Sequence, residues 1–204
     1  GQYSPTSRPG TRSPSTPFGS VDRPVNPCAF ALGSGARFVA RGIDVNKKLT
    51  DAFKAAYAHE GTAFVEIFQN CIVYNEDVFS DFTDKKTAPD TQLWVEHGEP
   101  LLFANGTKGI AMDPALFGAR VVDVVDGDWE AAGVLRHDQT NRALANMLVE
   151  MPFGDYPMAL GVIYDDPRPT FDGAVVEQNA AASEGKSDDL QALIEHGQTW
   201  KVGK

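Results

Sequence analysis

The sequence predicts an α/β protein built on a parallel sheet, and three observations lead to that class. Residues 28–75 alternate helical and strand patterns with short connections, as parallel strands joined by crossover helices do. The composition is globular, with 42% hydrophobic and 23% charged residues in 204. No apolar run approaches the roughly 18 residues that a membrane-spanning helix needs.

Asn26 and Pro27 open the first predicted helix, residues 28–35. Asparagine is a favoured N-cap, and proline fits the first helical position. Residues 37–41, Arg-Phe-Val-Ala-Arg, then predict a strand. Cys28 is expected in the core, because a cysteine without partners is most often a small buried hydrophobe.

A second helix and a second strand follow. Asp44 is expected to cap the helix and Gly61 to end it. Its buried face is expected to comprise the apolar residues at helical spacing, which are Leu49, Ala52, Phe53, Ala56 and Tyr57. Residues 64–68 predict the second strand. Ligands of such sheets usually bind beyond the carboxyl ends of the strands, so the segments that follow them are candidate sites.

After residue 80 the pattern is weaker. Residues 84–89 indicate a surface loop, and Asn105-Gly106 is a favourable hairpin turn between residues 100–103 and 108–112. The remaining expected elements are a short strand at 121–125, a helix at 141–151, a strand at 158–164, a cap or turn at 167–170, and a helix at 188–196.

Residues 1–27 contain six of the 13 prolines, so they cannot form a helix or a central strand. From composition this stretch fits either a flexible linker or an ordered, proline-stiffened loop at a functional site. Its three arginines and one aspartate give it a net charge of +2, which leaves −12 on the other 177 residues. A positive loop on an acidic protein suits an anionic ligand.

The overall charge and the cysteines exclude some functions. Lys and Arg number 18 against 28 Asp and Glu, a net charge of −10, which argues against non-specific binding to nucleic acid or to an anionic membrane. Cys28 and Cys71 are too few for a disulfide framework, and we expect a reducing, cytoplasmic location. The histidines show no metal-binding spacing and are expected on the surface or in packing roles: His59, His97, His137 and His196. The sequence opens at Gly1 without an initiator Met or a signal peptide, and we interpret it as the C-terminal part of a longer protein.

Two stretches resemble a known family: Gly1-Gln-Tyr-Ser-Pro-Thr-Ser7 and Val65-Glu-Ile-Phe-Gln-Asn-Cys-Ile-Val-Tyr-Asn75. They are similar to the beta subunit of the 2-oxoacid:ferredoxin oxidoreductases, in particular the 2-oxoglutarate type. Residues 26–33, 35–41 and 160–170 are similar in the same order. The resemblance implies the second half of a thiamine-diphosphate-binding, parallel-sheet (Rossmann-like) domain with a mixed C-terminal extension. The implied division is a cofactor-proximal loop at 1–27, the α/β half-domain at 28–80 and the extension at 81–204.

The resemblance also implies a site. In the family the first stretch lies near thiamine diphosphate, which gives Gly1, Gln2, Ser4 and Thr6 as candidate cofactor-binding residues. Cys71 matches the fourth cysteine ligand of a [4Fe-4S] cluster. The family's other three cysteine ligands are absent, as is the segment that holds Mg²⁺ and the diphosphate.

The implied reaction is oxidative decarboxylation of a 2-oxoacid, expected to be 2-oxoglutarate, to an acyl-CoA, with electrons passing through the cluster to ferredoxin. Its partners would be an alpha subunit, ferredoxin, coenzyme A and the 2-oxoacid. The fragment alone is expected to be inactive. Two alternatives remain: a non-catalytic structural or interaction module of the same fold, and a cluster-free thiamine diphosphate enzyme or a nucleotide-binding α/β protein.

Overall fold

The computed structural model describes residues 2–73, 75–186, 188–200 and 202–203. The chain divides into two compact units, Gly1–Arg168 and Pro169–Lys204. The elements of the first unit are, in chain order, α1 (Pro27–Gly33), β1 (Phe38–Ile43), α2 (Leu49–Ala58), β2 (Ala63–Phe68), α3 (Ser80–Thr83), α4 (Ala88–Thr91), β3 (Gln92–Val95), β4 (Leu102–Phe103), the 3-10 turn η1 (Ala104–Gly106), β5 (Lys108–Asp113), β6 (Gly118–Asp123), α5 (Arg142–Glu150) and β7 (Met158–Asp165). The second unit holds α6 (Phe171–Ser183) and α7 (Leu190–Glu195).

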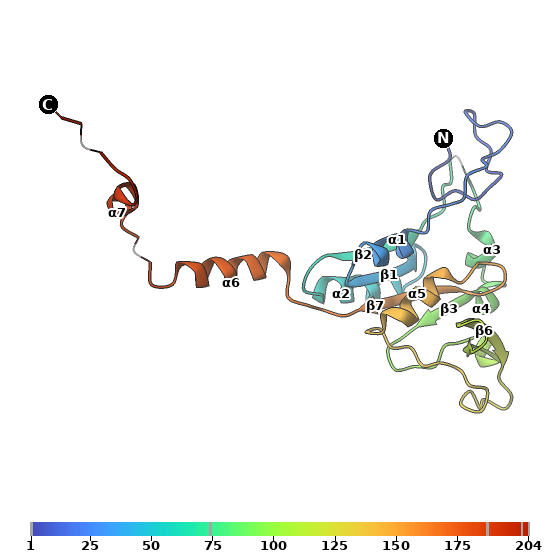
Figure 1. The fold of residues 1–204 in the computed structure, drawn as a ribbon. Helices are drawn as coiled ribbons and strands as arrows, with labels where there is room; N and C mark the ends of the chain where they lie inside the picture. The colour runs from blue at the N-terminus through green and yellow to red at the C-terminus, as the bar shows by residue number, and fades with distance from the viewer. Residues whose placement is uncertain (1, 74, 187, 201, 204) are drawn as a thin grey trace. The chain divides into compact units, whose positions relative to one another are not determined.

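A four-stranded sheet in the order β2-β1-β7-β3 forms the centre of the first unit (Figure 1). β1 and β2 are parallel, which confirms the predicted α/β class and the predicted strand pair. β7 runs antiparallel to β1 and parallel to β3, so the sheet is mixed rather than wholly parallel. Strands from both sides of residue 80 therefore share one sheet.

All six residues of β1 are buried, because the strand has a neighbour on each side and helices on both faces. Val39 packs into a cluster with residues of α1 and α5, whereas Phe38 and Ala40 pack against Ala52 of α2. The strand predicted at 37–41 is confirmed, and it is buried along its whole length rather than on one face. A central strand of an α/β sheet is covered on both faces and needs no polar side.

The predicted start of α2 is also wrong. Its N-cap is Lys48, whose side chain makes no capping hydrogen bond. Asp44 lies earlier, at the end of β1, where its backbone N–H donates to the Phe68 carbonyl oxygen at 3.1 Å. Asp44 thus helps to hold the carboxyl ends of β1 and β2 together.

The predicted buried face of α2 is only partly correct. Leu49 and Ala52 are buried, but Phe53 is 46% and Tyr57 94% exposed. The helix is short and meets the sheet mainly through alanines, so its two aromatic side chains point away from the core.

The later elements largely follow the pattern expected for them. β4 and β5 pair antiparallel around Asn105 and Gly106, which confirms the hairpin, and β6 adds a third strand. Asn141 caps α5 through hydrogen bonds from two backbone N–H groups, and β7 matches the strand expected at 158–164. β3 was not predicted, and the loop expected at 84–89 runs into α4.

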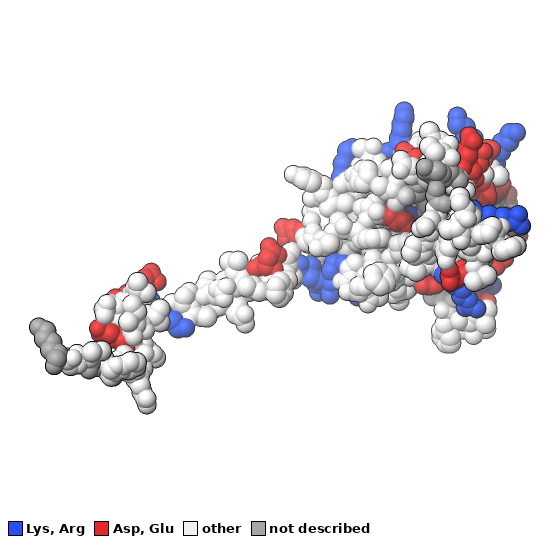
Figure 2. All heavy atoms as spheres, turned by 90° about the horizontal axis from the view of Figure 1, so that it is seen from above, with Lys and Arg blue, Asp and Glu red and all other residues white. Residues whose placement is uncertain are grey.

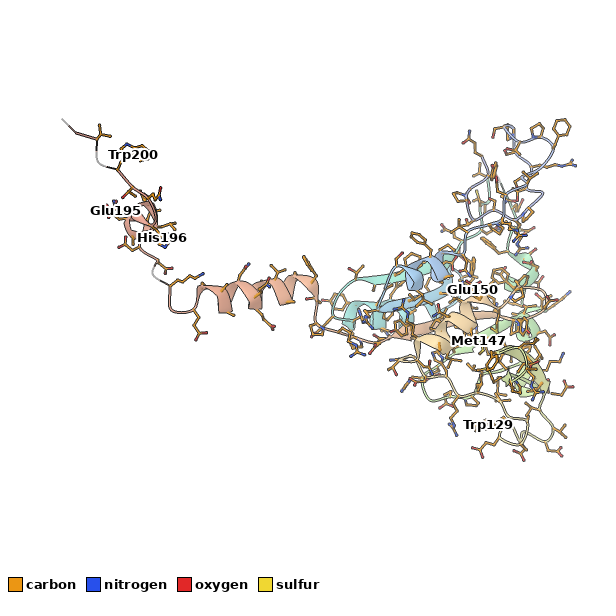
Figure 3. All side chains as sticks on the ribbon, in the orientation of Figure 1. Trp129, Met147, Glu150, Glu195, His196 and Trp200 are labelled. Carbon is orange, nitrogen blue, oxygen red and sulfur yellow. The ribbon has the colours of Figure 1, made fainter. Side chains whose placement is uncertain are left out.

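The second unit consists of α6 and α7. Thr170 caps α6, as the cap expected at 167–170 requires, but the helix itself was not predicted. α7 agrees with the helix expected at 188–196. None of the described residues of this unit is buried, and the three that Figure 3 labels there, Glu195, His196 and Trp200, are exposed. Among the helices that the structure describes, none combines the length and apolarity needed to cross a membrane.

Candidate functional site

Residues 2–25 form a closed loop, so the ordered alternative for the proline-rich start fits the structure. The backbone N–H of Gly10 donates to Ser20 O at 2.7 Å, and that of Val25 donates to Pro5 O at 2.8 Å. Gly19 has a φ of +95°, and a Cβ there would lie 3.0 Å from Gly10, so glycine is needed where the two sides of the loop touch.

The predicted cofactor-binding residues Ser4 and Thr6 lie together at the start of this loop. Their hydroxyl oxygens are 2.8 Å apart, and Ser7 Oγ is 3.3 Å from Ser4 Oγ. Gln2 is exposed beside them, and Gly1 lies outside the described residues. Exposed hydroxyls clustered in a turn can donate hydrogen bonds to phosphate oxygens.

Tyr3 closes the base of the loop. Its hydroxyl donates to Asp22 Oδ2 at 2.6 Å, and this hydrogen bond raises the pKa of Tyr3 above its ordinary value.

Arg8 anchors the middle of the loop to the body of the first unit. Its Nη1 lies 2.6 Å from Asp81 Oδ2 on α3, and its guanidinium lies 5.5 Å from the centre of the Phe153 ring. On the face shown in Figure 2, Lys and Arg side chains alternate with acidic ones rather than forming one basic patch. Arg8, one of the loop's three arginines, is held by a specific carboxylate and a ring.

A buried cluster of polar side chains lies at the end of the loop. Arg41 of β1 is 5% exposed, and its Nε donates to Glu66 Oε2 on β2 at 2.7 Å. Its Nη2 donates to Asn26 Oδ1 at 3.3 Å, while Asn26 Nδ2 donates to the Val149 carbonyl at 2.7 Å. One guanidinium thus joins the loop, β1 and β2.

Cys28 is fully buried in this cluster, which confirms its predicted core position. Its Sγ lies 3.2 Å from Glu66 Oε2. Burial raises the pKa of this thiol to about 12, with the charge of Glu66 adding to the effect. The thiol therefore stays protonated at neutral pH and is a poor nucleophile and metal ligand.

Four phenylalanines fill the space below the loop. Phe82 of α3 is fully buried and contacts Phe68, Phe79 and Phe153, with ring centres 5.0, 5.7 and 5.2 Å away. Tilted and edge-on arrangements of this kind are favourable for aromatic rings. The cluster fixes α3, and with it Asp81, against the end of β2.

Cys71 lies in an exposed turn after β2. The turn is closed by a hydrogen bond from the Asn75 backbone N–H to Cys71 O at 3.0 Å. Among the described residues there is no group of three or more His, Cys, Asp or Glu side chains that could hold a metal ion. A [4Fe-4S] cluster needs four ligands, so these residues do not hold one by themselves.

The four histidines lie on the surface or in the packed interior, as expected from the sequence. His137 is buried and its Nε2 lies 2.9 Å from the Val162 carbonyl oxygen. Burial lowers the pKa of His137 below its ordinary value. The His59 side chain is buried at 2.7 Å from Asp165, whereas His97 and His196 are exposed. The two buried rings serve packing.

Two hollows of about 430 and 480 Å³ share Lys48 and Trp94 in their walls, and His97 also lines the first. The Lys48 ammonium lies 5.4 Å from the centre of the Trp94 ring. Neither hollow is lined by Ser4, Thr6 or Cys71. We place the candidate site at the loop and not at these hollows, because the loop carries the clustered hydroxyls and Arg8 anchors it to α3, which packs on Phe68 at the carboxyl end of β2.

Comparison with known proteins agrees with this fold. No protein-family model matches the chain. The chain is 36% identical over 99% of its length to 2-oxoglutarate oxidoreductase subunit KorB of Mycobacterium tuberculosis, and covers 55% of that protein. It is 28% identical over 84% of its length to the 2-oxoacid:ferredoxin oxidoreductase subunit beta of Saccharolobus solfataricus, again covering 55%.

A solved structure of 2-oxoglutarate:ferredoxin oxidoreductase from Magnetococcus marinus, with 2-oxoglutarate, coenzyme A and succinyl-CoA bound, is similar in fold. The TM-score is 0.65 at 24% identity, over 98% of this chain and 53% of that one. Both relatives are subunits of oxidoreductases that act on 2-oxoacids, and the chain is similar to that class of subunit. Within the class, it resembles the KorB and beta subunits of 2-oxoglutarate and 2-oxoacid:ferredoxin oxidoreductases. It spans about half the length of the relatives it matches.

The residues that hold the site together were not predicted from the sequence. Arg41 and Glu66 occur in the middle of apolar strands, which is the usual sign of a buried pair. Their position opposite each other became visible only with the register of the sheet. The pair Arg8–Asp81 joins residues 73 apart in the sequence and left no local signal.

Proposed function

We propose that the protein containing this chain catalyses the oxidative decarboxylation of a 2-oxoacid, 2-oxoglutarate first, to an acyl-CoA with reduction of ferredoxin. The observation that carries the proposal is the match of 99% of the chain, at 36% identity, to a 2-oxoglutarate oxidoreductase subunit. Its expected partners are an alpha subunit, ferredoxin, coenzyme A and the 2-oxoacid. The scarcity of cysteines supports a cytoplasmic location.

Thiamine diphosphate would stabilise the carbanion equivalent left by decarboxylation. The residues proposed to hold its diphosphate are Gly1, Gln2, Ser4 and Thr6. The hydroxyls of Ser4 and Thr6 fit this role as hydrogen-bond donors, but residues 2–7 contain no carboxylate for Mg²⁺. The Mg²⁺ ligands are therefore expected elsewhere in the protein.

Cys71 is proposed as one of the four ligands of a [4Fe-4S] cluster, with the other three supplied from outside this chain. Its exposure and its place after the carboxyl end of β2 support the proposal. Cys28 is excluded as a ligand by its burial and its raised pKa. We also propose that residues 1–27 form a cofactor-proximal loop, that 28–80 form the second half of the thiamine-diphosphate-binding α/β domain, and that 81–204 form a C-terminal extension whose strands β3 and β7 complete the sheet.

The test is turnover by the complete protein together with its alpha partner. With 2-oxoglutarate, coenzyme A and ferredoxin, we expect ferredoxin reduction that depends on both coenzyme A and thiamine diphosphate. A complex that assembles but turns over no 2-oxoacid would instead favour the non-catalytic module.

A further inference from the structure

The buried cluster around Arg41 connects the two segments that the proposed function uses. Arg41 and Glu66 lie directly opposite each other on β1 and β2. Asn26 follows the loop of residues 2–25, and Glu66 lies five residues before Cys71 on the strand that leads to it. Arg41 therefore contacts both the residue that directly follows the loop and the strand that leads to Cys71.

We propose that Arg41 is a positioning residue that fixes the loop 2–25 and the Cys71 turn at one constant spacing. This inference rests on the proposed function for its purpose. Its physical content, the coupled order of two segments, does not depend on any bound cofactor. The sequence motif and the comparisons assign no role to Arg41.

The geometry requires a guanidinium at this position. Arg41 uses separate nitrogens for separate partners: Nε for Glu66, Nη2 for Asn26, and Nη1 at 3.3 Å from the sulfur of Met158. Its charge also lies 5.9 Å from the centre of the Phe68 ring at the end of β2. A lysine ammonium is a single point of charge and cannot reproduce this planar fork.

The burial of the pair explains why the constraint is stiff. The side chains of Arg41 and Glu66 are 5% and 14% exposed, so solvent cannot replace either partner. Burial by itself disfavours the charged form of Arg41, but the acidic groups around it keep its pKa above the ordinary value. Arg41 therefore keeps its charge in the buried pair.

The experiment compares backbone amide exchange in the complete protein and in the variant Arg41→Lys. Lysine keeps a positive charge in the buried cluster and so preserves folding, but a single ammonium cannot hold Glu66 and Asn26 together as the guanidinium fork does. We expect the amides of Val25 and Asn75 to exchange faster together, by roughly tenfold or more, as the loss of a charge-assisted hydrogen bond predicts. The amides of β7 are expected to stay within about twofold of the wild type.

Arg37→Met is the matched control. Arg37 lies just before β1 and pairs with Asp166 at 3.0 Å, but its side chain is 42% exposed. Arg37 therefore lies at the amino end of β1. Within the described residues, its side chain makes no hydrogen bond or ion pair with Asn26 or Glu66. Both amides are expected to exchange at the wild-type rate in this variant.

Three results would overturn the inference: unchanged exchange in Arg41→Lys, a change in only one of the two segments, or an equal increase over the whole protein. A thiamine diphosphate titration on the same samples separates this inference from the proposed function. We expect affinity to fall by roughly tenfold in Arg41→Lys and not in Arg37→Met. If the wild type binds no thiamine diphosphate while the exchange pattern still appears, the proposed function fails and the positioning role stands.

Discussion

Replacing Phe82 by alanine tests the packing that holds the candidate site. Phe82 is fully buried, and its ring touches three other phenylalanine rings at centre distances of 5.0 to 5.7 Å. Truncation of a fully buried phenylalanine costs about 3–5 kcal/mol, through lost burial and the cavity that remains. Since three ring contacts disappear at once, we expect a value in the upper half of that range.

The assay is urea unfolding of the complete protein, followed by tryptophan fluorescence and by far-UV circular dichroism. Phe18→Ala is the control, because the Phe18 side chain is 97% exposed on the loop and its loss should change the free energy of unfolding by less than about 0.5 kcal/mol. Phe82→Ala should also loosen Asp81 on α3 and release Arg8. A cost below about 1 kcal/mol for Phe82→Ala, or equal costs for both variants, would refute the reasoning.

Three further predictions concern other parts of the first unit. Gly161→Ala should lower the free energy of unfolding by at least about 2 kcal/mol, measured by thermal or urea unfolding. The reason is that Gly161 has a φ of +106° and that a Cβ there would lie 2.6 Å from a backbone oxygen of β3. Gly33→Ala is the control and should cost nothing, because there is open space around Gly33. Burial lowers the pKa of His137, so the unfolded chain takes up a proton at a higher pH than the folded chain does. The free energy of unfolding should therefore fall as the pH drops below about 6.5. His137→Gln should flatten that decline, and an unchanged slope would contradict the prediction. Asp81→Asn should speed trypsin cleavage after Arg12, because the loop loses an anchor, and a wild-type digestion rate would contradict the anchor.

Local patterns were sufficient for the elements near the site. The N-cap at Asn26 and the paired strands at 37–41 and 64–68 are determined by neighbours in the sequence, and the structure confirms them. The hairpin at Asn105 is local for the same reason. In each case the residues that determine the element lie within a few positions of one another.

The features that the sequence did not predict depend on contacts between residues far apart in the chain. β3 has only four residues, and it is a strand because β7, more than sixty residues later, pairs with it. The exposed Tyr57 matched a helical apolar spacing, yet spacing alone does not show how wide a face the sheet will cover. Arg41 presents the same difficulty at the site, because its three partners come from three separate segments.

The cysteines provide the most direct test of the proposed function. In the complete protein, Cys71→Ser should lose or destabilise the [4Fe-4S] cluster, because a serine oxygen is a much poorer ligand for iron–sulfur clusters than a thiolate. Cys28→Ser should cost only packing, since Cys28 is buried with a pKa of about 12. Thiamine diphosphate binding should survive both changes.

The deciding measurement is the iron and sulfide content of the two variants, with the visible spectrum and the rate of ferredoxin reduction recorded on the same samples. We predict that iron and ferredoxin reduction fall steeply in Cys71→Ser and remain at the wild-type level in Cys28→Ser. Full iron content and full ferredoxin reduction in Cys71→Ser would contradict the assignment of Cys71 and favour a cluster-free enzyme.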